Sequence, residues 1–197
     1  MSKHLRIAIA EDEPELLADY EETLAELGHE VVAKAKTGRE LVQLCLETRP
    51  DLIITDIKMP DMDGLEAAEQ IRQHGPIPIV IASAYHDSEF MERALQEHVL
   101  AYLIKPISQA ELEVSIALVM RRFREFQALQ QQTDDLRQAL EDRKLVERAK
   151  GILMTRAGLD EQDAFRRLQL LSSQKNQKMV EIAQMILTAD EAMQTDL

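Results

Sequence analysis

The chain has 197 residues, of which 45% are hydrophobic and 30% are charged, and this composition excludes a mainly disordered protein. No segment resembles a signal peptide, and no apolar run approaches the roughly 20 residues of a membrane-spanning helix, so we expect a cytoplasmic protein with no membrane partner. The net charge of −13 comes entirely from residues 1–135, because residues 136–197 carry ten basic and ten acidic residues.

The first part of the chain alternates short apolar runs with segments of helical spacing. The apolar runs, which predict strands, lie at 5–10, 30–35, 52–55, 77–82 and 100–104. Helical spacing of apolar residues is found at 16–27, 41–45, 65–71 and 90–95. The only cysteine, Cys45, falls in one of these helices and is expected to be a small buried side chain. The alternation predicts an α/β fold, with a five-stranded, parallel, doubly wound sheet of the flavodoxin-like kind.

The pattern changes after Pro106, because residues 108–150 contain neither glycine nor proline. This segment predicts one long helix. Its middle part has an imperfect pattern with alternating spacings of three and four, in which all positions except Thr133 are apolar: Phe126, Leu129, Thr133, Leu136 and Leu140. Such a heptad seam is typical of a coiled coil, and we place a coiled-coil linker helix at 123–142. A linker helix that does not pair with a second copy explains this short pattern equally well.

Two shorter helices are predicted to follow the long one. Gly151 and Gly158 are expected to bracket a break in the chain. Asp160, followed by Asp163, predicts a helix N-terminus with a capping side chain and an acidic first turn. Apolar residues at 179–187 predict the last helix. The C-terminal part, 136–190, is therefore expected to be a small three-helix, all-α domain whose first helix is shared with the linker.

Polar and charged residues follow the predicted strands at their carboxyl ends. Because these ends meet at one edge of a parallel sheet, a group of five side chains is expected to converge there. The five are Glu11, Asp12, Asp56, Ser83 and Lys105. Three carboxylates repel one another unless a cation lies among them, and a hard oxygen site with few protein ligands suits Mg²⁺. Because the lysine and the hydroxyl can donate to a phosphoryl group, the sequence predicts a phosphoryl-transfer site.

These residues, in this order, resemble the receiver domains of two-component response regulators, and the resemblance covers 4–122. The motifs that carry it are Glu11-Asp12-Glu13, Asp56 with Met59-Pro60 and Gly64 behind it, Ser83-Ala84, and Tyr102-Leu103-Ile104-Lys105-Pro106. The resemblance implies that a sensor histidine kinase phosphorylates Asp56, with no small-molecule substrate other than a phosphoryl donor. It also implies that Asp12, Asp56 and the backbone carbonyl of Lys58 bind Mg²⁺ directly, whereas Glu11 does so through water. One departure is Glu11, where the family often has aspartate.

The resemblance also implies a switch beside the acceptor. Lys105 would pair with the phosphoryl group, across a cis bond to Pro106. The Ser83 hydroxyl would move to the phosphate, and the Tyr102 ring would follow inward. A receiver fold that has lost phosphorylation is the alternative, and the complete set of acidic residues together with Lys105 argues against it.

The C-terminal part carries excess positive charge over 143–178, with nine basic residues against four acidic ones. This asymmetry suggests a polyanion partner, although a solvated helix face has the same pattern. Residues 136–190 resemble the ANTAR family of RNA-binding transcription antiterminators, and the most specific element is the run Ala149-Lys150-Gly151-Ile152-Leu153-Met154. The resemblance implies binding to a stem-loop element in nascent RNA, which prevents a terminator hairpin from forming. Two departures are Gln169, where the family often has a basic residue, and Ser172, where it often has alanine.

Side chains that bind RNA are expected to combine basic residues for affinity with a few polar contacts to exposed bases. We select six candidates by their charge and their position within the matched module. These are Arg148, Lys150, Arg166, Arg167, Lys175 and Lys178.

Phosphorylation would connect the two halves of the chain. A phosphoryl group adds about two negative charges and would change the face beside the last strand, where the long helix begins. The helix would then favour a homodimer, which presents two RNA-binding modules to tandem stem-loops. A DNA-binding output and a protein-interaction output are the alternatives. We expect no enzymatic output, because no histidine, cysteine or glycine-rich phosphate loop follows Pro106.

Overall fold

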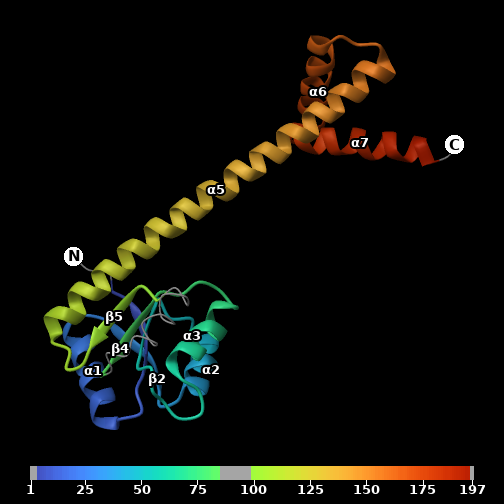
Figure 1. Ribbon diagram of the computed structural model, residues 1–197. Helices are drawn as coiled ribbons and strands as arrows, with labels where there is room; N and C mark the ends of the chain where they lie inside the picture. Colours follow the sequence, from blue (N-terminus) through green and yellow to red (C-terminus); the bar gives the residue numbers. More distant parts are fainter. Residues whose placement is uncertain (1–3, 85–98, 196–197) are drawn as a thin grey trace. The chain divides into compact units, whose positions relative to one another are not determined.

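The computed structural model describes residues 4–84 and 99–195. The chain divides into two compact units, Met1–Gln127 and Ala128–Leu197 (Figure 1). Each unit has its own buried core. The boundary between them falls within one long helix, so each unit is described by itself.

A parallel sheet forms the centre of the first unit. Its strands are β1 (Arg6–Ala10), β2 (Glu30–Ala35), β3 (Leu52–Thr55), β4 (Ile79–Ser83) and β5 (Ala101–Ile104). The spatial order is β2-β1-β3-β4-β5, with every neighbouring pair parallel. Strands β3 and β4 are buried at every residue, which explains their continuous apolar sequence. The predicted flavodoxin-like, doubly wound fold is confirmed, although β4 begins after Pro78 rather than at residue 77, because proline has no N–H to donate to the sheet.

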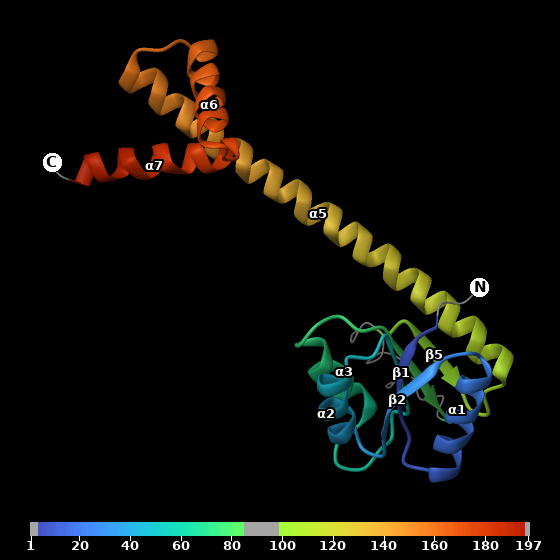
Figure 2. The same cartoon turned by 180° about the vertical axis from the view of Figure 1, so that it is seen from behind.

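Helices cover both faces of this sheet (Figure 2). On one face, α1 (Pro14–Glu26) and the first turns of the long helix α5 (Gln109–Ala157) bury side chains such as Leu24 and Leu112. On the other face lie α2 (Gly38–Thr48) and α3 (Gly64–Arg72). Cys45 of α2 is buried there as predicted, and burial raises the pKa of its thiol to about 12. The helix expected at 90–95 lies outside the described residues.

The long helix α5 starts with a reciprocal cap. The Ser108 N–H donates to the Glu111 carboxylate at 2.9 Å, and the Glu111 N–H donates to the Ser108 hydroxyl at 3.3 Å, which is a capping box. The predicted break at Gly151 is wrong, because the helix continues through Gly151 to Ala157 and is followed by Gly158, where φ is +66°. A glycine inside a helix costs only about 1 kcal/mol, and the following Leu153 packs against the core of the second unit.

The second unit consists of α5 from Ala128 onward together with α6 (Glu161–Lys175) and α7 (Met179–Thr195). Its core contains Ala149, Leu168, Ile182 and Ala183, one or two from each helix. As predicted, Asp160 caps α6, and its carboxylate accepts a hydrogen bond from the Asp163 N–H at 2.8 Å. Among the described residues, none of the helices combines the length and the hydropathy that crossing a membrane requires.

Candidate functional site

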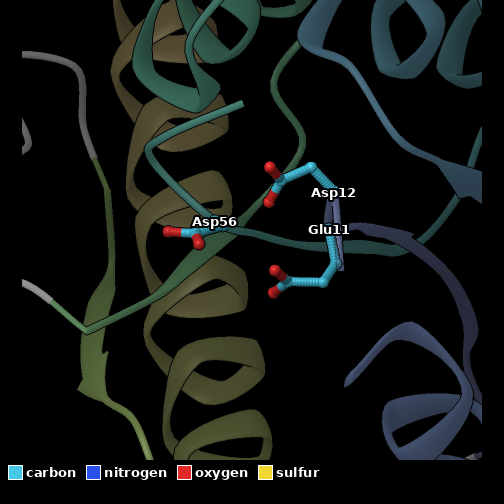
Figure 3. Close-up of side chains that lie close together, drawn as sticks. All are labelled: Glu11, Asp12 and Asp56. Carbon is cyan, nitrogen blue, oxygen red and sulfur yellow. The ribbon is translucent and has the colours of Figure 1, made fainter. Parts of the chain in front are cut away.

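Three carboxylates meet at the carboxyl edge of the sheet. Glu11 and Asp12 follow β1, and Asp56 follows β3. Figure 3 shows the three side chains turned toward one another, and their nearest carboxylate oxygens all lie within 4.8 Å. Strands β1 and β3 are neighbours with Ala10 paired to Thr55, and this register brings the residues that follow them side by side.

A lysine from the end of β5 joins this acidic group. The Lys105 Nζ donates to Asp56 Oδ2 at 2.8 Å and to Glu11 Oε2 at 2.5 Å. Burial raises the pKa of Glu11, and its hydrogen bond with Lys105 opposes that rise. Burial acts to lower the pKa of Lys105, but the hydrogen bonds to Asp56 and Glu11 outweigh it and raise the pKa above its usual value. The lysine is therefore a cation at neutral pH and partly neutralises the three acids.

The Asp56 side chain is held in place by its neighbours along the chain. Its Oδ1 accepts a hydrogen bond from the Ile57 N–H at 2.5 Å, and its backbone N–H donates to the Ala10 carbonyl at 3.0 Å. The Thr55 hydroxyl donates to the Asp56 carbonyl at 2.9 Å. The Asp56 side chain is buried, with 7% of the residue exposed. The Ile57 N–H therefore orients a buried carboxylate that lies close to the other two acids.

Gly64 allows the start of α3 to pack against the acceptor loop. A Cβ atom at this position would lie 1.9 Å from the Asp56 carbonyl oxygen and 2.9 Å from the Thr55 hydroxyl. The Gly64 N–H donates to the Ile57 carbonyl at 2.8 Å. Any side chain at Gly64 would therefore displace the backbone of Asp56. The sequence marks Gly64 as part of the receiver motif behind Asp56, but only the structure shows this close approach.

Two buried polar atoms near this edge have no hydrogen-bond partner among the described residues: Ser83 Oγ and Glu11 Oε1. Ser83 is the last residue of β4 and is fully buried. Buried polar groups are normally paired, so these atoms indicate that a ligand belongs here. Carboxylate oxygens around an unpaired buried oxygen suit a hard cation, and the donor set fits Mg²⁺.

The remaining predicted residues of this site lie around the same edge. Tyr102 of β5 is half-buried and packs against the apolar cluster beneath α2 and α3. Lys58 is exposed two residues after Asp56. The peptide bond from Lys105 to Pro106 is cis, as the resemblance implies.

The six basic candidates of the second unit are spread over three segments. Arg148 and Lys150 are on α5, Arg166, Arg167 and Lys175 are on α6, and Lys178 immediately precedes α7. All except Lys150 are exposed. Arg166 lies 3.6 Å from the Asp163 carboxylate within the same helix.

Lys150 differs from the others because its ammonium group is enclosed. Its Nζ lies 2.7 Å from Glu147 Oε2 and 2.8 Å from Glu161 Oε1, and its side chain is 11% exposed. Hydrogen bonds to these carboxylates raise the pKa of Lys150. Glu161 is the first residue of α6, so Lys150 ties α5 to the start of α6.

Sequence reasoning missed one arginine of the second unit. The Arg156 Nε donates to Asp190 Oδ1 at 3.0 Å, which links α5 to α7. Arg156 follows Arg148 by eight residues on the same helix, and this spacing could have placed both on one side of α5.

Two known protein families match the chain, one in each part. The family model described as the response regulator receiver domain matches residues 7–117, and the model of the ANTAR domain matches residues 134–187. A solved DNA-binding response regulator of the LuxR family from Staphylococcus aureus aligns with a TM-score of 0.57 and 31% identity, over 59% of this chain and 98% of that one. The first unit, with its acidic edge, is therefore a receiver domain.

Two curated relatives extend the comparison. The transcriptional regulatory protein PdtaR of Mycobacterium tuberculosis is 42% identical over 182 residues, which cover 92% of this chain and 89% of the relative. The transcriptional regulatory protein HptR of Staphylococcus aureus is 39% identical over 94 residues, covering 48% of this chain and 37% of the relative. The chain belongs to the response regulators and joins a receiver domain to an ANTAR domain.

Proposed function

We propose that a sensor histidine kinase phosphorylates this response regulator on Asp56 in the cytoplasm. Phosphorylation then controls an ANTAR output that binds stem-loops in nascent RNA and causes transcription antitermination. The observation that carries the proposal is the placement of Asp56, a buried carboxylate that Lys105 and the Ile57 N–H orient toward Glu11 and Asp12. The likeness to PdtaR, a transcriptional regulatory protein, supports an output at transcription.

The transfer is a displacement at phosphorus. A carboxylate oxygen of Asp56 forms the new P–O bond, the P–N bond of the phosphohistidine breaks, and the released imidazole nitrogen takes a proton from solvent. Lys105 then donates to a phosphoryl oxygen, where it stabilises charge that develops in the transition state. Asp12, Asp56 and the Lys58 carbonyl would hold Mg²⁺ directly and Glu11 would hold it through water, and the ion would neutralise charge on the acids and on the incoming phosphoryl oxygens.

The state of Asp56 reaches the output through Ser83 and Tyr102. The buried Ser83 hydroxyl, which has no partner among the described residues, gains one when it donates to the phosphoryl group. Tyr102 then moves inward on β5, the strand that leads directly into α5. This change favours a homodimer through the exposed seam of α5, and the dimer presents two RNA-binding modules.

Exposed basic residues of the second unit support RNA as the ligand. Arg166, Arg167, Lys175 and Lys178 are all exposed on or next to α6, within the matched ANTAR domain. Basic side chains bind the phosphate backbone and give affinity that falls steeply with salt. Lys150, whose ammonium group is enclosed by two carboxylates, is retained as a residue that positions α6 for this contact.

Phosphorylation on Asp56 is tested with acetyl phosphate and Mg²⁺, read by intact-protein mass spectrometry. We expect the wild type to gain one phosphoryl group and Asp56→Asn to gain none. Asp61→Asn is the matched control, because Asp61 is exposed in the same loop and its positive φ of 66° suits asparagine equally well. A phosphoryl group on Asp56→Asn would place the acceptor elsewhere.

RNA binding is tested by titrating the protein into an RNA with two tandem hairpins, with and without acetyl phosphate, across a salt series. Binding that tightens on phosphorylation and weakens steeply with salt is the expected result. Duplex DNA of the same length is the competitor. Preferential binding to the duplex would favour a DNA-binding output, and no binding to either nucleic acid would favour a protein partner.

A further inference from the structure

The second unit has an open hollow between α5 and α7, and only one of the six basic candidates, Arg148, lines it. Its volume is about 670 Å³, and its walls include Arg148, Gly151, Thr155 and Arg156 of α5 and Leu187 and Asp190 of α7. The α5 residues at 148, 151 and 155 are spaced by three and four, so they share one face of the helix. That face opens into the hollow.

Gly151 has no structural reason to be glycine in the free protein. It lies inside α5, and its φ is not among the positive values found in the chain. A Cβ atom at this position would meet nothing within 4 Å. Glycine is among the least favourable residues in a helix interior, so its presence is explained when a ligand must approach the helix backbone closely.

Two arginines flank the glycine, and both have carboxylates in place of an external anion. The Arg156 Nε lies 3.0 Å from Asp190 Oδ1, and the Arg148 Nη2 lies 3.8 Å from Glu191 Oε1. The arginine side chains are 55% and 63% exposed, respectively. The Arg148–Glu191 pair is exposed on both sides, and such pairs are weak. In the Arg156–Asp190 pair the arginine is exposed, although the Asp190 side chain is only 13% exposed. A guanidinium binds phosphate in a two-pronged geometry. A phosphate can therefore take the place of these carboxylates.

We propose that this hollow binds a backbone phosphate of the RNA hairpin. Arg148 and Arg156 leave Glu191 and Asp190 and donate to the phosphate, while the sugar–phosphate chain passes over Gly151, where no side chain stands in its way. The two carboxylates of α7 compete with the RNA for the arginines. This inference rests on the proposed RNA binding and adds the location of one contact.

The sharpest test is Gly151→Ala, because it changes the free protein in the opposite direction from the complex. Alanine favours the helix and contacts nothing, so thermal stability should stay the same or rise. The affinity of the phosphorylated variant for hairpin RNA should fall by about tenfold, because the methyl group occupies the path of the RNA backbone. A lower affinity together with a higher stability cannot come from a damaged fold.

The ion pair is tested with two variants that should act in opposite directions. Arg156→Gln should weaken RNA binding and reduce the slope of log affinity against log salt by about one. Asp190→Asn removes the competing charge and should tighten binding by about threefold or more. Arg137→Gln is the matched control, because Arg137 is an exposed arginine of α5 outside the hollow.

Each result separates this inference from the proposed function. Equal RNA binding by wild type, Gly151→Ala and Arg156→Gln would overturn the hollow as a contact and leave RNA binding intact. A similar loss of RNA affinity in Arg156→Gln and Asp190→Asn would show that the ion pair has a structural role, and would overturn the assignment. A loss of affinity in Arg156→Gln with an unchanged salt slope would show that Arg156 contacts a base and not a phosphate, and would overturn the assignment as well. A wild type that binds no hairpin RNA would overturn the proposed function and this inference with it.

Discussion

Lys105 makes the acidic edge of the sheet possible before any phosphoryl group arrives. Its ammonium group bridges Asp56 and Glu11, which follow different strands and would otherwise repel each other. The Ile57 N–H fixes the second oxygen of Asp56. Because these donors already hold the acceptor, the transfer reaction needs little reorganisation of the protein at the site itself.

The close approach at Gly64 predicts a large effect from one methyl group. In Gly64→Ala, the new Cβ atom would overlap the Asp56 carbonyl oxygen, because an ideal Cβ built on Gly64 lies 1.9 Å from that oxygen. The start of α3 and the acceptor loop must move apart, and we expect a loss of about 3 kcal/mol of unfolding free energy. The displaced Asp56 should also accept phosphate more slowly from acetyl phosphate. Chemical denaturation and intact-protein mass spectrometry measure the two effects.

Gly28→Ala provides the matched control for this variant. Gly28 has a φ of +81°, but a Cβ there would meet nothing within 4 Å. The substitution should therefore cost only about 1 kcal/mol, from the backbone conformation alone, and leave the rate of phosphorylation unchanged. Equal destabilisation by the two variants would show that the overlap with Asp56 is relieved at no cost.

At the scale of helices and strands, local signals predicted what local physics determines. The buried strands and the Asp160 cap depend on a few adjacent residues, and both were predicted correctly from the sequence. The helix through Gly151 was not, because tertiary packing of the following turn outweighs the low propensity of one glycine. The bridge from Lys105 to Glu11 spans 94 positions, and the enclosure of Lys150 depends on where α6 packs. The spacing of residues along the chain predicts neither of these direct contacts.

Ser172 makes two hydrogen bonds to the connection between α6 and α7. The Ser172 hydroxyl donates to the Gln177 carbonyl at 2.6 Å, and the Gln177 N–H donates to the Ser172 carbonyl at 3.1 Å. Ser172→Ala leaves a half-buried carbonyl without its donor and should cost about 1 kcal/mol. For a unit of this size, the thermal transition of the output domain should fall by about 4–8 °C. Ser173→Ala, an exposed neighbour on the same helix, should change it little, and equal effects would contradict a role for this bond.

At the scale of the whole molecule, the two domains are joined by one continuous helix. The receiver match ends at residue 117 and the ANTAR match begins at 134, and α5 runs without interruption through both. Four large apolar residues of its middle part are more than half exposed: Phe126, Leu129, Leu136 and Leu140. Large apolar side chains at heptad spacing are stabilised when a second helix covers them, which supports the proposal that the phosphorylated protein pairs through this seam.

Leu136→Lys tests this proposal, since it places a charge in the middle of the seam at a residue that is 67% exposed in the single chain. The folded monomer should be unaffected, because Leu136 contributes to no core cluster. With acetyl phosphate and Mg²⁺, light scattering should find a dimer for the wild type and a monomer for Leu136→Lys and Asp56→Asn. Gln138→Lys adds the same charge on the opposite face of the helix and should still dimerise. The affinity of Leu136→Lys for tandem hairpins should fall to its affinity for one hairpin, because the gain from a second linked site is lost. Dimers of equal strength in phosphorylated wild type and Asp56→Asn would show that the acceptor does not control the seam, and dimers of Leu136→Lys would show that the seam is not the interface.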